Sequence, residues 1–536
     1  MKLDYKKVFY VGLAFFIITI FWQTYDSIIT KILIDKFGLN QFWSGVVMAL
    51  DNILALFMLP LFGAISDRTN HKLGRRTPYV IIGTVVAAFA FIGLSFVDNY
   101  QTQLVKASDN QIVEKYEVIV DSDSSLRFSQ AFWQERMDEM KLERQEALQQ
   151  NVITQERYTQ WESSVYTKMD DIVSKANDGT ITAIDLTYLD GYYHRYLSDL
   201  AWQVTLVNPL NFVVFILVLL VALIAMSIFR SPAVALMPDV TMKPLRSKAN
   251  AIINLMGAAA GVTALVILTV FGLGGRSYVV YSAAFIGVGL IMMLVMVIFL
   301  WKVKEPKLVL ERQADDLKFG LSEDDDDVHD MHELPKDKKM SLYLILFSVF
   351  LWFMGYNAVM TKVSDYAPKI LQLPSFTLPL LVANVTAIIA FIPIGILSTK
   401  FGRRKTILAG IILLTLCFGS VFFLTKETGS LMFVIFGLTG IGWATINVNS
   451  YPMVVELSKG ANVGKYTGYY YTFSMAAQIL TPMLSGFLMD ALHPKALFPY
   501  ATFFVALAFI TMFLTKHGDA KAEKKTLLES FDVDMD

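Results

Sequence analysis

Residues 63–78 read GAISDRTNHKLGRRTP and form a charged connector between two long apolar runs. Each run is long enough to cross a hydrocarbon core of roughly 30 Å as a helix. Positive charges resist translocation, so they anchor a short connector on the cytoplasmic side of a membrane. The connector carries the carboxylate of Asp67 and the cations Arg68, Lys72, Arg75 and Arg76. It therefore predicts two membrane spans joined by a cytoplasmic loop.

Apolar runs of similar length continue through the chain. The sequence has 536 residues, of which 55% are hydrophobic and 17% charged, and its mean hydropathy is +0.49. This composition is more apolar than that of soluble proteins, so we predict an all-α membrane protein with twelve transmembrane helices. The spans lie near residues 8–30, 42–65, 78–97, 209–229, 250–272, 278–301, 341–361, 377–398, 406–424, 431–452, 465–488 and 497–515.

The distribution of charge predicts how the chain crosses the membrane. Lysines and arginines in the short connectors are concentrated on the side that holds both termini, so we expect a multi-pass protein of the cell membrane with both termini cytoplasmic. The net charge of -1 gives no reason to expect a nucleic-acid partner. The first span is too long for a signal peptide and has no small-residue cleavage site, so we expect it to be retained. Cys417 is the only cysteine, which excludes an intramolecular disulfide.

The two halves of the chain resemble each other. YDSIITK at residues 25–31 matches YNAVMTK at residues 356–362, and GAIS in the connector matches GILS at nearly the same offset. A later match falls at a shorter offset, as an insertion of residues 99–207 would cause. We therefore predict two pseudo-symmetric six-helix bundles with an insert between helices 3 and 4. The predicted parts are a first bundle (1–98 and 208–301), an extracytoplasmic insert (99–207), a cytoplasmic linker (302–340), a second bundle (341–515) and a cytoplasmic tail (516–536).

The connector resembles the loop signature of the major facilitator superfamily, in which a glycine is followed by Asp-Arg and then Gly-Arg-Arg. RSPAVALMPDVTMKPLRSKANAIINLMG and GKYTGYYYTFSMAAQILTPMLSGFLMD resemble the branch that holds sucrose/proton symporters and glycoside–cation symporters. Two parallel repeats place a binding site at their interface near the midplane and expose it by alternating access. The resemblance covers all twelve helices but not the insert or the acidic linker, and it implies the same architecture. It also implies proton-coupled uptake of a sugar or glycoside. One departure is Asp26, because these relatives usually carry asparagine there, as the seventh span does at Asn357.

Charged residues at the predicted cytoplasmic ends suggest a gate. The positive-inside rule does not require Asp67, which is free to pair with an arginine or to sit at a helix N-terminus. In the resembled superfamily this loop latches the cytoplasmic ends of the halves together. The alternative is that the connector serves topology alone. The predicted gate comprises Asp67, Arg68, Arg75, Arg76, Asp239, Arg246, Arg403, Arg404, Glu456 and Lys465.

Two carboxylates, Asp26 and Asp51, lie inside predicted spans. Charged side chains are costly within a bilayer, so we expect these residues to couple transport to a proton or a sodium ion. A structural hydrogen bond to a neighbouring helix is the alternative role. Trp22, Tyr25 and Asp26 share one helix face, and Trp352 and Tyr356 repeat that spacing in the seventh span.

A sugar presents apolar C–H faces and a rim of hydroxyl groups, so aromatic rings interleaved with carboxylate and amide groups suit it. Aromatic anchoring at the membrane interface and amide contacts between helices are the alternatives. The predicted substrate-binding residues are Trp22, Tyr25, Asp26, Trp352, Tyr356, Asn357, Trp443, Asn447, Tyr470 and Gln478.

The remaining segments carry weaker signals. In the insert, Trp133, Met137, Met140 and Leu148 fall on one helical face, which predicts surface helices that either cap the transport path or decorate the protein. His329 and His332 lie in an acidic run typical of a solvated linker, so we expect no metal. We find no nucleophile–base pattern, metal-ligand spacing or phosphate-binding glycine loop, and we expect neither an enzyme nor a cofactor. We expect a monomer. The alternative functions are a proton-driven exporter of amphiphilic compounds and a non-transporting receptor that uses the insert for recognition.

Overall fold

The computed structural model describes residues 3–176, 179–242, 245–319, 335–457 and 463–517. Within these residues twelve helices are long and apolar enough to span a membrane, which confirms the predicted number. The first six are α1 (Tyr5–Lys31), α2 (Gln41–Asp67), α3 (Thr77–Lys106), α10 (Pro209–Val240), α11 (Arg246–Val270) and α12 (Ser282–Lys302). The second six are α14 (Lys336–Ile370), α15 (Thr377–Phe401), α16 (Arg403–Val421), α17 (Leu431–Glu456), α18 (Val463–Ala491) and α19 (Leu497–Leu514).

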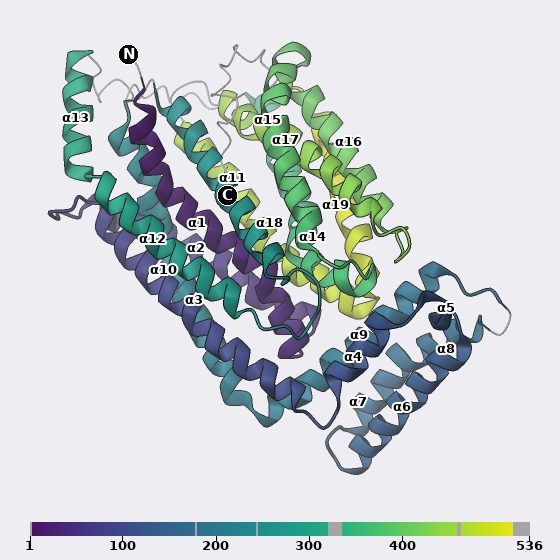
Figure 1. Cartoon of the computed structure of the whole chain (residues 1–536). Coiled ribbons are helices and arrows are strands. Elements are labelled where there is room, and N and C mark those ends of the chain that lie inside the picture. The colour runs from purple at the N-terminus through teal and green to yellow at the C-terminus, as the bar shows by residue number, and fades with distance from the viewer. Residues whose placement is uncertain (1–2, 177–178, 243–244, 320–334, 458–462, 518–536) are drawn as a thin grey trace.

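The spanning helices form two bundles with separate cores (Figure 1). One cluster of buried apolar side chains lies among α1, α2, α3, α10, α11 and α12, and a second lies among the six helices of the other half. The halves meet where α2 packs on α18, α11 on α15 and α1 on α14. The motifs YDSIITK and YNAVMTK therefore lie on two neighbouring helices, α1 and α14.

Local sequence explains how several of these helices begin and bend. Asp4 caps α1 by accepting hydrogen bonds from the backbone N–H groups of Lys6 and Lys7 at 3.0 and 3.1 Å. Asn40 caps α2 through the N–H of Trp43 at 2.8 Å. The spanning helices also contain internal prolines, which are tolerated where neighbouring helices satisfy the freed backbone groups. They are Pro60, Pro232, Pro238, Pro368, Pro393, Pro452 and Pro482.

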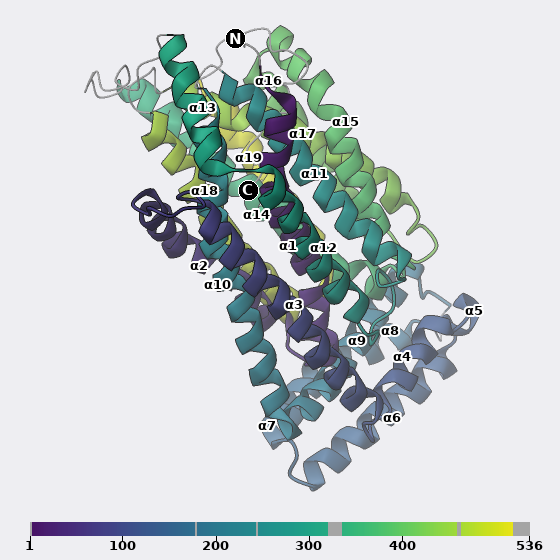
Figure 2. The same cartoon turned by 60° about the vertical axis from the view of Figure 1, so that its left-hand side comes forward.

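The insert is a helical subdomain at one end of the bundles (Figures 1 and 2). It comprises α4 (Ile112–Asp121), α5 (Ser124–Arg127), α6 (Gln130–Gln149), α7 (Gln155–Trp161) with its π-helical continuation η2 (Glu162–Tyr166), α8 (Thr167–Ser174) and α9 (Ala183–Val207). As predicted, Trp133, Met137 and Met140 lie on one helix and are buried, with Leu148 packed against the same cluster. The third span runs on to Lys106 rather than ending near residue 97.

The two ends of the bundles carry different segments. The insert side carries α4–α9. The connector side carries the 63–78 connector and α13 (Glu305–Lys318), the short helix that follows α12. The described amino terminus also lies away from the insert (Figure 1).

Candidate functional site

The first half gathers an acidic cluster where α1 and α2 lie next to each other. Tyr25 is fully buried, and its hydroxyl lies 3.5 Å from the backbone oxygen of Met48 on α2. The ring of Trp22 meets that of Tyr25 edge to face at 5.5 Å. Asp26 on α1 and Asp51 on α2 are close enough for their carboxyl groups to interact electrostatically. The structure therefore brings the two predicted coupling residues together from neighbouring helices.

Arg230 on α10 also belongs to this cluster and is not among the residues predicted from the sequence. Its guanidinium interacts electrostatically with Asp51, which accepts a hydrogen bond from Asn52 at 2.8 Å. The predicted fourth span ended at residue 229, which assigned the arginine to a connector. The helix instead continues to Val240. A cation beside Asp51 changes the electrostatic balance of the site, because it favours an ionised carboxylate.

The second half contributes an aromatic stack. The rings of Tyr356 on α14 and Trp443 on α17 lie parallel with centroids 3.6 Å apart, and Phe353 meets Trp443 edge to face at 5.3 Å. Both rings of the stack are only half-buried, and so are Asn357, Asn447 and Gln478. Such a surface offers ring faces and amide groups side by side.

The predicted binding residues divide by burial. Trp22, Asp26, Asp51 and the members of the aromatic stack are half-buried, which leaves part of each side chain for a ligand. Tyr25, Trp352 and Tyr470 are buried, and Trp352 packs within the core of the second half. Tyr470 lies 3.0 Å from the hydroxyl of Ser450 on α17. These three side chains therefore offer little surface to a ligand.

The connector network is built within the first half. Arg76 pairs with Asp67 and also contacts Asp239 on α10 at 2.8 Å, while Arg75 contacts Asp239 at 2.7 Å. Glu305 accepts hydrogen bonds from the N–H groups of Arg75 and Thr77 at 2.8 and 2.7 Å, which caps α3. The predicted latch requires pairs between the halves. In this conformation these pairs instead tie α2, α3, α10 and α13 to one another.

The other predicted gate residues are dispersed. Arg68 is exposed, and Arg246 donates to the backbone oxygens of Pro238 and Thr241 at 3.2 and 3.4 Å. Arg403 is buried, and Arg404 donates to the backbone at the end of α19. The side chains of Glu456 and Lys465 lie outside the described part of the chain, as do His329 and His332. Among the described residues no group of three or more His, Cys, Asp and Glu side chains could hold a metal.

Buried charges join the two halves on the insert side. η1 (Ile32–Lys36) continues α1 as a π-helix, and its Asp35 pairs with Lys369 at the end of α14. Lys369 also contacts Asp365 at 2.5 Å, and Gln41 donates to Asp365 at 2.6 Å. Lys31 lies 3.6 Å from Asp35. The chain thus places charged groups from both halves in one protein-enclosed network.

Backbone groups strengthen this closure. Asp490 on α18 accepts hydrogen bonds from the N–H groups of Gln41 and Phe42 at 3.0 and 2.8 Å, so it caps α2 from the opposite half. A carboxylate there also meets the positive end of the helix dipole. Lys362 donates to the backbone oxygen of Gln41 at 2.8 Å. The predicted spans ended at residues 30 and 361, so Lys31 and Lys362 were assigned to connectors. Their repetition at the end of both motifs was the available signal.

The insert rests on both halves through α9 and α4. His493, just after α18, lies 3.0 Å from the backbone oxygen of Tyr188, and Arg195 donates to the backbone oxygen of Asp490 at 2.7 Å. On the first half, Thr205 donates to the backbone oxygen of Phe37 at 2.9 Å. The hydroxyl of Tyr116 accepts a hydrogen bond from the backbone N–H of Ser277 at 3.0 Å. The insert therefore bridges the halves.

Three solved structures share this fold. A bacterial homologue of the iron transporter ferroportin in an inward-facing state is 12% identical, with a TM-score of 0.59 and coverage of 96% of this chain and 99% of that one. A bacterial homologue of the human lysosomal transporter Spinster, inward-facing and unoccupied, is 12% identical, with a TM-score of 0.56 and coverage of 96% and 98%. The xylose transporter XylE from E. coli, in an inward open conformation, is 12% identical, with a TM-score of 0.52 and coverage of 97% and 98%.

Family comparisons agree with this fold. A search of curated proteins finds no significant match to the sequence. The family model described as MFS/sugar transport protein matches residues 10–106. The model described as Major Facilitator Superfamily matches residues 198–390 and 374–531, more than half of the chain. The chain is therefore a membrane transport protein that belongs to the major facilitator superfamily.

Proposed function

We propose that this chain is a secondary active transporter that takes up a sugar or glycoside together with a proton. The observation that carries the proposal is the contact between α1 and α14, which hold the repeated motifs. One helix brings Asp26 next to Asp51, and the other brings Tyr356 onto Trp443. Carboxyl groups suit the coupling ion, and stacked rings beside amides suit the C–H faces and hydroxyls of a sugar.

Several features support a conformation that is closed on the insert side. The buried pair of Asp35 and Lys369 and the cap of α2 by Asp490 close the insert side across both halves. The pairs of Asp67 and Asp239 on the connector side remain within one half. With both termini cytoplasmic and the insert outside a cell membrane, the path would be closed to the exterior and free to open inward. The chain acts as a monomer, and sodium is the alternative to the proton.

Counterflow in proteoliposomes tests the central site. Liposomes loaded with one unlabelled sugar are expected to accumulate the same labelled sugar when the protein recognises it, and the panel includes sucrose, maltose and xylose. Trp443→Ala is expected to weaken the apparent affinity about tenfold, because it removes one ring of the stack. Trp443→Phe should retain most of the affinity.

Trp301 supplies the matched control, because it is a tryptophan with 70% of its surface exposed, at the end of α12. Trp301→Ala should leave counterflow unchanged. If no sugar supports counterflow by the wild type, the sugar assignment is wrong. If Trp443→Ala and Trp301→Ala behave alike, the aromatic stack is not the binding surface.

A further inference from the structure

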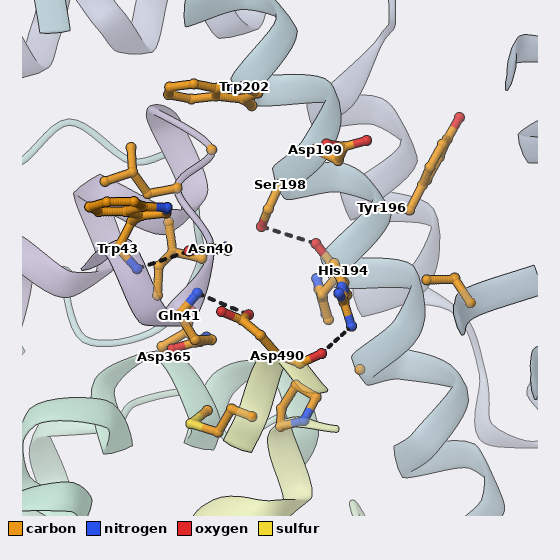
Figure 3. A pocket seen from close by; sticks show the side chains of 18 of the residues that line it. Asn40, Gln41, Trp43, His194, Tyr196, Ser198, Asp199, Trp202, Asp365 and Asp490 are labelled. Atoms are coloured by element: carbon orange, nitrogen blue, oxygen red, sulfur yellow. Dashed lines mark hydrogen bonds between the residues drawn. The ribbon is translucent and has the colours of Figure 1, made fainter. Parts of the chain in front are cut away.

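A cavity of about 660 Å³ lies on the insert side, between the insert and the ends of both bundles (Figure 3). Its volume falls in the range of small-molecule sites, roughly 300–1,000 Å³. The insert contributes residues from α6, α7, η2 and α9; the first half contributes the start of α2, and the second half contributes the ends of α14 and α18. The central candidates, such as Asp26 and Trp443, do not line it.

Aromatic rings form much of the cavity wall. Trp43 and Trp202 lie at the edge of the space in Figure 3, and Trp161 and Tyr196 also line the cavity. Arg144 lies between two of these rings, 5.6 Å from the centroid of Trp161 and 5.4 Å from that of Tyr196. Flat aromatic rings next to fixed polar groups suit a ligand that has both apolar faces and polar groups on its surface.

Residues that line the cavity hold buried polar atoms with no hydrogen-bond partner in the described part of the chain. They include Nε2 of His194, Oε1 of Gln41, Nε1 of Trp161 and Nε of Arg144, and each of these residues is more than nine-tenths buried. Unpaired buried polar groups are rare in proteins because they cost free energy. These four come from the insert and from the first half, and they include both donors and an acceptor.

Several charges around the cavity are paired, while Arg195 donates to the backbone oxygen of Asp490 and Arg157 is exposed at the edge of the lining. Arg144 pairs with Asp199, Lys369 pairs with Asp365, and Asp490 caps α2. Burial and the nearby charge of Lys369 lower the pKa of His194 to about 3, so its imidazole is neutral at pH 7. The buried part of the wall, where Arg144 and Lys369 are paired and His194 is neutral, favours an uncharged ligand with many hydroxyl groups.

We propose that this cavity is a second binding site, which takes a neutral sugar or glycoside on the insert side and is separate from the central site. The inference goes beyond the proposed function, because it does not depend on what crosses the membrane. Residues from the insert and from both halves line the cavity, so the complete site exists only while these parts are together. A bound sugar therefore stabilises this conformation, since a ligand favours the state that binds it more tightly.

Cysteine protection gives a direct test. Cys417 is buried, so a cysteine introduced on the surface can be labelled selectively. Ser164 lines the cavity and is half-buried, whereas its neighbour Ser163 is exposed and does not line it. In the full-length protein in nanodiscs, sucrose, maltose or xylose is expected to slow maleimide labelling of Ser164→Cys at least threefold. The same sugar should leave the labelling of Ser163→Cys unchanged.

Tryptophan variants extend the test to the cavity wall. Trp43 is 58% exposed and lines the cavity, and Trp301 is 70% exposed and lies outside it. Trp43→Ala in the Ser164→Cys background is expected to raise the sugar concentration needed for protection about tenfold, because it removes one ring. Trp301→Ala should not change that concentration, and neither should Trp443→Ala in the central site.

Each outcome decides between the two sites. Absence of protection by all three sugars, or equal protection at Ser163→Cys and Ser164→Cys, would overturn the second site whatever transport shows. Protection that Trp443→Ala abolishes would also overturn it and assign the sugar to the central site. Protection that survives Trp443→Ala, in a protein without sugar counterflow, would retain the second site and refute the proposed transport of sugar.

Discussion

Asp35 in η1 and Lys369 in α14 form an ion pair that joins the two halves, with only 3% and 7% of their side-chain surfaces exposed. Lys369 lies between this carboxylate and that of Asp365. Both partners lie near the ends of the two helices that carry the repeated motifs. If the halves separate on the insert side during transport, this contact must break. The ion pair then stabilises only the conformation in which the insert side is closed. A change to the pair therefore shifts the equilibrium between the closed and open conformations.

Asp35→Asn is predicted to open the insert side. Removing one partner of a buried pair costs about 3–5 kcal/mol of stability. This cost falls only on the conformation in which the halves are in contact on the insert side. Spin labels at Val207→Cys and Leu492→Cys, both exposed on this side, would report the separation by pulsed EPR. A new population at longer distance is expected.

Asp121→Asn is the control for this change. Asp121 pairs with Arg276, and each of these side chains is more than half exposed. The pair joins the insert to the first half only. Exposed pairs contribute little, so the distance distribution should match that of the wild type. Unchanged distances in Asp35→Asn would show that the buried pair does not hold the gate.

Neutralising the central carboxyl groups is predicted to weaken coupling. Asp26→Asn keeps the shape of the side chain and part of its hydrogen bonding but cannot carry a proton. Sugar binding should therefore persist better than in Asp26→Ala, while uptake loses its dependence on external pH. Asp51→Asn is expected to act in the same way. Uphill accumulation with an unchanged pH profile in both asparagine variants would exclude these residues as the coupling groups.

Hydropathy predicted the spans because a helix that crosses a membrane must be apolar over the thickness of the hydrocarbon core. It did not predict where the helices end, since Lys31, Asp35 and Lys369 lie in helices that continue past the apolar run. Each is polar in any local window, and each is buried because a distant segment supplies a partner. The partner of Asp35 belongs to the other half of the chain. No local pattern encodes such a pair.

The candidate site shows the same division. Helical spacing selected Tyr356 and Trp443 separately, but their stacking depends on how α14 packs against α17. Trp352 was selected on the same spacing, yet it faces the core of the second half. Periodicity identifies a helix face, and only packing decides whether that face meets a ligand or another helix. Glu305 was missed because its role as the cap of α3 requires the connector to fold back onto α13.

On the connector side, Asp239→Asn is predicted to destabilise the protein more than Asp67→Asn. Asp239 accepts hydrogen bonds from the guanidinium groups of Arg75 and Arg76, and 13% of its side chain is exposed. Asp67 pairs with Arg76, and 57% of its side chain is exposed. Loss of a charge-assisted hydrogen bond at the more buried site costs about 1.5–3 kcal/mol. The melting temperature in detergent would measure the difference. A latch between the halves instead predicts that Asp67→Asn speeds labelling of a cysteine beside the connector.

Acidification is predicted to loosen the insert, because His493 must be neutral where the insert docks. Its Nδ1 accepts a hydrogen bond from the N–H of Lys495 at 3.1 Å, so Nε2 is the nitrogen that donates to the backbone oxygen of Tyr188. Burial lowers the pKa of His493 to about 3. The ring also faces Tyr192 and the cation of Arg195, and neither is a carboxylate that would favour the charged form.

The sign of the effect follows from the two protonation states. In the docked state His493 stays neutral down to about pH 3, whereas a free histidine gains its proton near pH 6.5. The undocked state therefore binds more protons between these values, so docking is strongest above about pH 6.5 and weakens as the pH falls toward 3. At pH 5 the loss is roughly 2 kcal/mol, at about 1.4 kcal/mol per pH unit.

Spin labels at Leu142→Cys on the insert and Leu492→Cys on the second half would follow this docking, since both positions are exposed. The wild type should show longer distances at pH 5 than at pH 7. His493→Gln retains an N–H donor for Tyr188 without a titrating ring, so it should remove much of the response. His194, whose pKa is also lowered to about 3, should carry the remainder. If His493→Gln separates as readily as the wild type at pH 5, the imidazole does not hold the insert in place.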